Sequence, residues 1–379
     1  MDFELTSEHL MLKESAASFV KKDHSFKRLR ELKDDEWGYS KEVWGKMAEL
    51  GWMALIYPEQ YDGLELEFSF SVGLLEEFGK GLLPEPWLST VLLAGNAVMM
   101  SGTEDQKQEI LPQIASGDLM MTVAYLEDGG LYDVNFCSTN AEQKGDGHTL
   151  NGKKIFVLDG CSADKYIVSA RTSGSVSDND GITLFLIPRD AEGLKIIPLK
   201  RMDGGNACIL ELNDVAVGEG DIIGEKGGGY PVLADVIDQA TAGLCIELVG
   251  GMNATLNMTV EYLTERMQFG KPIGTFQALQ HKAADMFIQK ELATSSAYYA
   301  IASMDEKTED RAMAVSLAKA KCSAAFMDIT KTAIQLFGAI GFTTEADIGF
   351  FLKRAKVTET LFGDVDYHLE RYTALRDID

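Results

Sequence analysis

The stretch from Arg266 to Gln280, RMQFGKPIGTFQALQ, lies between two long segments with helical periodicity. Gly270 and Pro272 interrupt that periodicity, so one helix is expected to end near Arg266 and the next to begin near Gln277. A guanidinium at a helix end, with free backbone N–H groups and an amide across a tight turn, suits an anion such as a pyrophosphate. The alternative is a corner whose arginine only caps carbonyls, and the spacing alone favours this alternative.

Length and charge limit the classes of protein that fit. A chain of 379 residues exceeds one ordinary core, so two or three domains are expected. The net charge of −24 argues against nucleic acid and anionic membranes as partners. It also means that an anionic ligand must be met by local cations or helix N-termini.

Targeting segments and metal sites are not expected. No apolar run approaches about 20 residues, which predicts no transmembrane helix. The N-terminus, MDFELTSEHL, has neither a basic start nor an apolar segment, which predicts no signal peptide. The five cysteines are scattered without a CxxC pair and the five histidines are isolated, so neither a disulfide framework nor a metal site is predicted. The expected compartment is the reducing cytoplasm.

The periodicity changes twice along the chain and predicts three domains. Residues 1–120 show helical spacing, with Thr103 as a candidate N-cap. Residues 121–229 contain short β-branched runs separated by turn clusters, which predicts a β domain. In residues 230–379 the helical period returns in segments long enough for a four-helix bundle. The expected fold is α+β and multidomain, with an N-terminal helical domain, a middle β-barrel-like domain and a C-terminal four-helix bundle. The expected bundle helices cover about 230–266, 277–302, 309–337 and 345–362, and the expected strands about 149–159, 165–171, 181–188, 194–200 and 208–217.

Six motifs, in this order along the chain, resemble the acyl-CoA dehydrogenase family. They are LGWMALIYPEQYDGLE (50–65), GTEDQKQEILPQIASGD (102–118), TLNGKKIFVLDGCSADKYIVSAR (149–171), DVAV and IIGEKGGGY (214–230), EYLTERMQFGKPIGTFQALQHKAADM (261–286) and QLFGAIGFTTE (335–345). The resemblance implies an oxidoreductase and flavoprotein that removes the α,β hydrogens of an acyl-CoA thioester. In the family a carboxylate takes the α proton and the β hydrogen leaves as hydride to FAD.

The resemblance assigns the opening stretch a role in cofactor binding. In the family, the matching arginine and glutamine and a glycine turn reach across a dimer interface and bind the pyrophosphate and adenine half of the neighbour's FAD. The residues that match these positions are Arg266, Phe269, Gln277, Gln335 and Gly338.

The sequence departs from the family at the general base. The family glutamate occupies one of two places, which correspond here to Phe362 and Ala240, and neither residue can take a proton. Glu247 shares a helix face with Ala240 but lies about two turns, or roughly 10 Å, further along the axis. Asp238 is the next stand-in, although it lies on the opposite side of the helix from Ala240. The alternative is that both are structural acids, as are Asp364 and Asp366.

The flavin-facing side also departs from the family. The family loop T-E-P-x-x-G-S-D becomes Leu126–Asp133, which loses three of the family residues and gains Asp128. A family hydroxyl that donates to the flavin ring is replaced by Leu158, and Asp364 stands where the family has a threonine. A carboxylate facing a phosphate would cost roughly several kcal/mol. Residues facing this chain's own flavin are therefore altered, whereas residues lent to a neighbour are kept.

Three hypotheses follow. The favoured one is a subunit of a heterotetrameric, FAD-dependent acyl-CoA dehydrogenase that lacks its own base and completes the FAD site of a partner chain. The tail LFGDVDYHLERYTAL (361–375) resembles that of small subunits of bacterial enzymes of the pimeloyl-CoA dehydrogenase type. The others are a self-sufficient homotetramer with an unusual base and a non-enzymatic family member. Degradation of fatty acids or steroid side chains is the expected context. Arg171 and the Lys200–Arg201 pair are available cations for CoA, but solvated surface is the favoured interpretation of all three.

Overall fold

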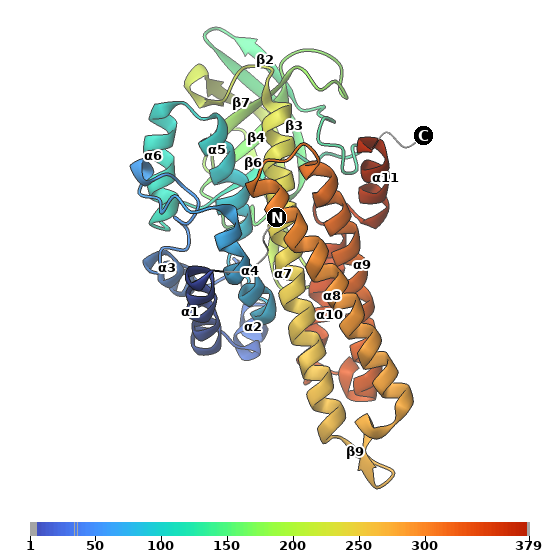
Figure 1. Ribbon diagram of the computed structural model, residues 1–379. Coiled ribbons are helices and arrows are strands. Elements are labelled where there is room, and N and C mark those ends of the chain that lie inside the picture. The colour runs from blue at the N-terminus through green and yellow to red at the C-terminus, as the bar shows by residue number, and fades with distance from the viewer. Residues whose placement is uncertain (1–5, 34, 36, 377–379) are drawn as a thin grey trace. The chain divides into compact units, whose positions relative to one another are not determined.

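The computed structural model describes residues 6–33, 35 and 37–376. Residues 1–5, half of the N-terminal stretch from which no signal peptide is expected, lie outside this description. The chain divides into two compact units. Unit 1 comprises Met1–Arg30, Glu67–Leu83 and Thr241–Asp379, and unit 2 comprises Glu31–Leu66 and Pro84–Ala240. The predicted order of helices, sheet and helices along the chain is confirmed (Figure 1).

Unit 2 is built on one sheet of eight strands. Its order is β6-β7-β3-β2-β4-β5-β8, and β1 pairs in parallel with β4. Alternating β-branched residues direct one set of side chains into a buried core that includes Tyr166, Phe185 and Leu210. The strands are β1 (Met121–Ala124), β2 (Asn140–Lys144), β3 (Gly147–Leu158), β4 (Lys165–Arg171), β5 (Ile182–Pro188), β6 (Leu194–Lys200), β7 (Asn206–Gly218) and β8 (Ile222–Ile223).

Three α-helices of unit 2 precede the sheet in the sequence. Thr103 caps α6 as predicted, because its hydroxyl accepts from the Gln106 N–H while the Gln106 side chain accepts from the Thr103 N–H. A π-helix, Leu88–Gly95, runs directly into α5 and packs against β1. The α-helices of this part are α3 (Lys41–Glu49), α5 (Asn96–Ser101) and α6 (Glu104–Ala115), with single 3₁₀ turns at Glu59–Tyr61 and Glu219–Asp221.

Unit 1 contains the C-terminal helical bundle. Helices α8 and α9 are antiparallel neighbours, and α10 and α11 both pack on α9 (Figure 1). No helix in the described part of the chain is both long and apolar enough to cross a membrane. The helices are α1 (Ser7–Asp23), α2 (Phe26–Leu32), whose last two residues belong to unit 2, α4 (Ser71–Gly81), α7 (Gly229–Glu265), whose first twelve residues belong to unit 2, α8 (Gln277–Asp305), α9 (Arg311–Phe337), α10 (Ile348–Thr360) and α11 (Val365–Leu375), with 3₁₀ turns at Phe68–Phe70, Ile273–Thr275 and Gly338–Phe342.

Candidate functional site

The corner between α7 and α8 is a small hairpin. Its strands are β9 (Met267–Gln268) and β10 (Lys271–Pro272), and Phe269 and Gly270 form the turn with φ angles of 53° and 79°. Two left-handed residues in succession are the geometry of a tight two-residue hairpin turn. The Arg266 carbonyl accepts from the Ile273 N–H at 2.8 Å, which closes the base of the hairpin. The hairpin lies at the end of the bundle marked β9 in Figure 1.

The C-terminal end of α9 is attached to the same end of the bundle. The Tyr262 ring stacks on Phe337 with centroids 4.3 Å apart, and the Tyr262 hydroxyl donates to the Phe337 carbonyl at 3.2 Å. Tyr262 lies one turn before Arg266, so this contact brings the turn from Gln335 to Gly338 beside the hairpin. The structure therefore gathers the five predicted cofactor-binding residues at one end of unit 1.

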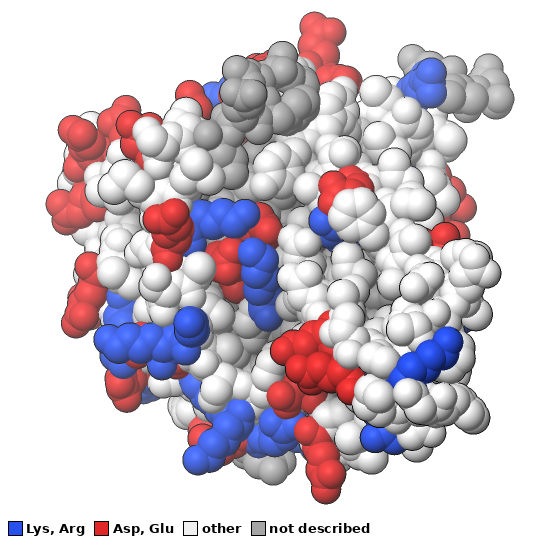
Figure 2. All heavy atoms as spheres, turned by 60° about the horizontal axis from the view of Figure 1, so that its bottom comes forward, with Lys and Arg blue, Asp and Glu red and all other residues white. Residues whose placement is uncertain are grey.

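All five of these residues face solvent. Arg266, Gln277, Gln335 and Gly338 are exposed, and Phe269 is 90% exposed with its edge toward Phe276. Within the described residues, Arg266 has no carboxylate within 4 Å. An exposed, unneutralised guanidinium with two nearby amides can bind an anion brought by another molecule. Despite the net charge of −24, basic side chains stay in small groups between acidic ones on the face drawn in Figure 2.

The two positions at which the resemblance predicts the family base hold buried residues that cannot accept a proton. Ala240 is fully buried in α7, and Phe362 is 5% exposed with a left-handed φ of 61°. The Phe362 carbonyl lies 3.0 Å from His368 Nε2, and the Gly363 carbonyl accepts from Lys319 at 2.7 Å. Asp364 accepts from the Tyr367 N–H and is the N-cap of α11, a structural use of its carboxylate.

Of the two stand-in acids, Asp238 is buried and Glu247 is partly buried. Glu247 forms an ion pair with Arg354, whose guanidinium also donates to the carbonyls of Leu82 and Leu83 at 3.3 and 3.4 Å. This pairing occupies the Glu247 carboxylate and does not favour its use as a base. Asp238 is 6% exposed in the part of α7 that belongs to unit 2.

The loop Leu126–Asp133 is held by a buried ion pair at Glu127. The Glu127 carboxylate lies 2.5 Å from Lys154 Nζ and also accepts from the backbone N–H groups of Ser138 and Thr139, at 2.7 and 3.0 Å. Burial alone would raise the pKa of Glu127, but the Lys154 ammonium and the hydrogen bonds from Ser138 and Thr139 together outweigh burial and lower that pKa to about 2. The added Asp128 pairs with exposed Lys153 at 2.9 Å, so its charge is partly neutralised.

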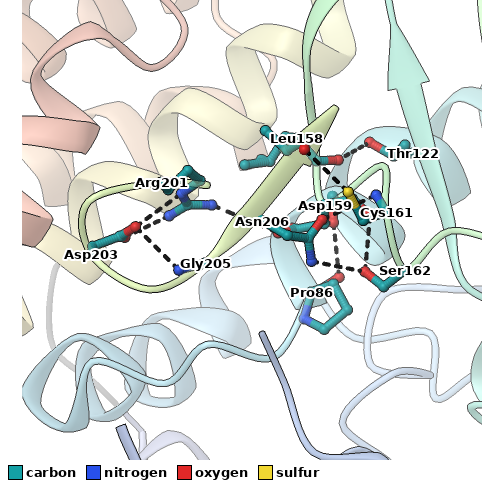
Figure 3. Close-up of polar contacts among 12 residues, drawn as sticks. Pro86, Thr122, Leu158, Asp159, Cys161, Ser162, Arg201, Asp203, Gly205 and Asn206 are labelled. Atoms are coloured by element: carbon teal, nitrogen blue, oxygen red, sulfur yellow. Dashed lines mark hydrogen bonds and ion pairs between the residues drawn. The ribbon is translucent and has the colours of Figure 1, made fainter. Parts of the chain in front are cut away.

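The end of β3 carries a charged network that the sequence did not indicate (Figure 3). Leu158 is buried, and its carbonyl accepts from Thr122 at 2.7 Å. The next residue, Asp159, accepts from Ser89 at 2.7 Å and lies 3.6 Å from Arg201 Nη1. Arg201 donates twice to Asp203, at 3.1 and 2.6 Å.

Two of the cations considered for CoA are structural. Arg171 is 7% exposed and donates to backbone carbonyls of the two loops beside it, including those of Asn135, Asp178 and Asp180, at 2.8, 2.9 and 2.8 Å. Arg201 is almost buried in the network just described. Solvated surface is therefore wrong for both arginines, and Lys200 alone is exposed.

Models of the three acyl-CoA dehydrogenase domains match this chain in order. The N-terminal domain matches residues 6–118, the middle domain 122–215 and the C-terminal domain 227–374. The chain belongs to the acyl-CoA dehydrogenase family. Mitochondrial isovaleryl-CoA dehydrogenase from Pongo abelii is 30% identical over 94% of this chain and 85% of its own length.

Solved acyl-CoA dehydrogenase structures share the whole fold. Butyryl-CoA dehydrogenase from Megasphaera elsdenii superposes with a TM-score of 0.92 at 28% identity, and all of both chains is covered. A chain of the ChsE4-ChsE5 complex from Mycobacterium tuberculosis superposes with a TM-score of 0.91 at 26% identity, again with full coverage of both. The family implies FAD, and the exposed end of unit 1 fits an anionic dinucleotide. In unit 2, the side chain of Leu158 has no hydrogen-bond donor. The end of β3 therefore does not fit a flavin ring that requires a side-chain hydroxyl at this position.

Proposed function

We propose that this chain is a subunit of an FAD-dependent acyl-CoA dehydrogenase that lacks its own catalytic base and completes the FAD site of a partner chain. FAD, when bound, accepts the β hydrogen of the acyl-CoA thioester as hydride. Arg266, Gln277 and Gln335 would hold the pyrophosphate and adenine half through charge-assisted and amide hydrogen bonds. Phe269 and the Gly338 turn would shape the surface against which that half lies.

One observation carries this proposal. The five residues matching the lent half of the FAD site all project into solvent, whereas both base positions hold a buried apolar residue. A chain that served its own flavin would need a carboxylate at Phe362 or Ala240. Heteromeric assembly has a precedent in the ChsE4-ChsE5 complex, which shares this fold. The proposal also includes the reducing cytoplasm as the compartment, expected from the scattered cysteines, and the degradation of fatty acids or steroid side chains as the context.

Co-expression tests the proposal directly. The chain is purified alone and with a catalytic acyl-CoA dehydrogenase encoded beside it, and bound flavin is quantified by absorbance after protein release. We expect no tightly bound FAD on the lone chain and less than one FAD per chain in the complex. Arg266→Ala should lose most of that FAD, whereas Arg376→Ala, which changes an exposed arginine of the tail, should retain it.

Two other outcomes would decide for the alternatives. FAD and dehydrogenase activity in the lone chain would reject the proposal in favour of a self-sufficient homotetramer, and Glu247→Gln and Asp238→Asn would then test the base. A chain that binds neither flavin nor any partner of the family would be a non-enzymatic member.

A further inference from the structure

The hairpin between α7 and α8 carries Lys271 on strand β10, a cation outside the five cofactor-binding residues. Its side chain is exposed, and it forms no ion pair with a carboxylate in the described part of the chain. Instead its Nζ lies over the Phe276 ring, 4.5 Å from the ring centroid. A cation resting on an aromatic face is restrained in position, while its charge stays available to a ligand.

The register of the hairpin places Lys271 on the same face as Arg266. Gln268 is directly opposite Lys271, and the Arg266 carbonyl accepts from the Ile273 N–H, so Arg266 is opposite Ile273. Because successive side chains of a strand alternate between its two faces, Arg266 and Gln268 share one face with Lys271, and Met267 points to the other. Diagonal positions on one face are about 7–8 Å apart, within reach of long side chains. The guanidinium and the ammonium can therefore approach one ligand together.

The charge around the hairpin favours more than one cation for a diphosphate ligand. The pyrophosphate of a dinucleotide carries two negative charges, whereas Arg266 supplies a single positive charge. Glu261 and Glu265 are both exposed on the last two turns of α7 and add negative charge near Arg266. Since like charges repel a bound anion, the guanidinium alone leaves this surface with an excess of negative charge once the ligand is bound. Lys271 supplies a second positive charge.

We propose that Lys271 is a further binding residue of the FAD site, where its ammonium and the Arg266 guanidinium together hold the pyrophosphate of a partner chain's FAD. This role rests on the proposed function, because it concerns the same ligand. The two cations are complementary, since a guanidinium donates paired hydrogen bonds in a fixed plane and an ammonium is a compact charge with freely oriented donors. Phe276 positions the ammonium. The alternative is a lysine that only covers the Phe276 ring and stabilises the hairpin.

Substitution of Lys271 in the purified complex with the partner chain tests this role. FAD is titrated into the flavin-free complex, and its dissociation constant is measured from flavin fluorescence at low and at high salt. Lys271→Ala should raise the dissociation constant about ten-fold at low salt, because a charge-assisted hydrogen bond is lost. The difference from the wild type should shrink at high salt, since ions screen exposed charges. Lys271→Arg keeps the charge and the contact with the ring, so it should bind FAD within about two-fold of the wild type.

A control variant and a second ligand locate the effect. Lys307→Ala removes an exposed lysine just beyond the other end of α8 and should bind FAD like the wild type. ADP contains a pyrophosphate and adenine but no flavin ring, so in Lys271→Ala it should compete with FAD about ten-fold less well than it binds the wild type. Thermal unfolding of each complex shows whether the variants are folded.

Arg266→Ala in the same assay separates the role of Lys271 from the proposed function. Loss of FAD in Arg266→Ala, with wild-type affinity in Lys271→Ala, would overturn the role of Lys271 and leave the proposed function intact. Unchanged affinity in both variants would reject both. A weakening that does not depend on salt, that Lys271→Arg shares with Lys271→Ala, or that leaves ADP unaffected would mean that Lys271 acts only through the structure of the hairpin, and it would also overturn the proposal.

Discussion

Lys153 and Lys154 are adjacent in β3 but lie in opposite electrostatic settings. Lys153 is exposed and pairs with exposed Asp128, whereas Lys154 is fully buried and pairs with buried Glu127. Period-2 alternation explains the difference, because neighbouring strand residues point to opposite faces. The buried pair orders the loop Leu126–Asp133, so the loop keeps its frame although several of its family residues have changed.

Removing the two lysines one at a time should therefore give very different results. Lys154→Met leaves the Glu127 carboxylate buried without its cation, which should lower the free energy of unfolding by about 3–5 kcal/mol. Lys153→Met breaks an exposed pair and should cost less than about 1 kcal/mol. Urea unfolding followed by circular dichroism measures both. Equal costs for the two variants would contradict the assigned role of Lys154.

At Gly338 the backbone conformation disfavours a side chain, although no neighbouring atom would contact one. Its φ of 68° and ψ of −144° lie in a region that L-residues rarely adopt, and an added Cβ would meet nothing within 4 Å. Gly338→Ala should therefore cost about 1–3 kcal/mol of stability from strain alone. Gly45→Ala, in the middle of α3 and also without close contacts, should instead stabilise by about 0.5–1 kcal/mol. Thermal or urea unfolding of the two variants gives the comparison, and a neutral Gly338→Ala would refute the strain.

At the scale of elements, helices α4 and α7 pack with their backbones in contact. A Cβ on Gly250 would lie 1.9 Å from the Glu76 carbonyl oxygen, and one on Gly79 would lie 1.8 Å from that of Glu247. Glycine at both positions permits this approach. Glu76 is buried at the crossing and is paired with Lys13 at 2.7 Å and Lys80 at 3.3 Å.

Substitution at this crossing should force the helices apart. Gly250→Ala should destabilise the chain by about 1–3 kcal/mol, because a methyl group in a packed contact displaces backbone rather than a flexible side chain. Gly349→Ala in α10, where the nearest atom is 3.9 Å away, is the matched control and should be neutral or stabilising. Chemical denaturation of both variants is the measurement, and a tolerated Gly250→Ala would show that the crossing adjusts.

Elements with a strong local pattern were predictable from the sequence. The strands Lys165–Arg171 and Leu194–Lys200 match the prediction residue for residue, because β-branched runs ended at clear turn signals. Helix α8 begins at Gln277 as expected. The sequence could not show that Leu88–Gly95 is a π-helix rather than an α-helix, because its buried apolar residues give the same local signal for both. Strand β1 was missed because it is stabilised by pairing with distant β4. Strand β2 pairs with adjacent β3 and was missed because its sequence, NAEQK, contains no β-branched residue.

Some residues of the candidate site could be placed together from local sequence, and others could not. Arg266, Phe269 and Gln277 lie within twelve residues of sequence, so their common location could be inferred from one turn. Their proximity to Gln335 depends on the Tyr262–Phe337 contact between distant helices, and it was expected only through the family resemblance. The network of Asp159, Arg201 and Ser89 joins three separate segments, and nothing local in the sequence specifies it.

At the scale of the whole molecule, several buried groups keep an unusual protonation state. Burial lowers the pKa of His24 to about 4, with Arg28 adding to the effect. Burial likewise lowers the pKa of His368 to about 3, assisted by Lys319 and Arg371. Both histidines are therefore neutral in the folded chain at pH values where an unfolded histidine, with a pKa near 6.5, binds a proton. The pKa of Glu127 is also lowered, to about 2.

The chain should consequently lose stability as the pH falls below about 6.5. Between pH 6.5 and about 4 the unfolded state binds protons that the folded histidines do not, so the free energy of unfolding should fall by roughly 1 kcal/mol per pH unit for each histidine. Glu127 extends the loss as the pH falls further through its lowered pKa. Urea unfolding at pH 7, 6 and 5 measures the slope. His368→Asn should be less stable at pH 7 but show a shallower slope, because one of the two titrating histidines is gone. A slope equal to that of the wild type would mean that His368 is already protonated in the folded chain.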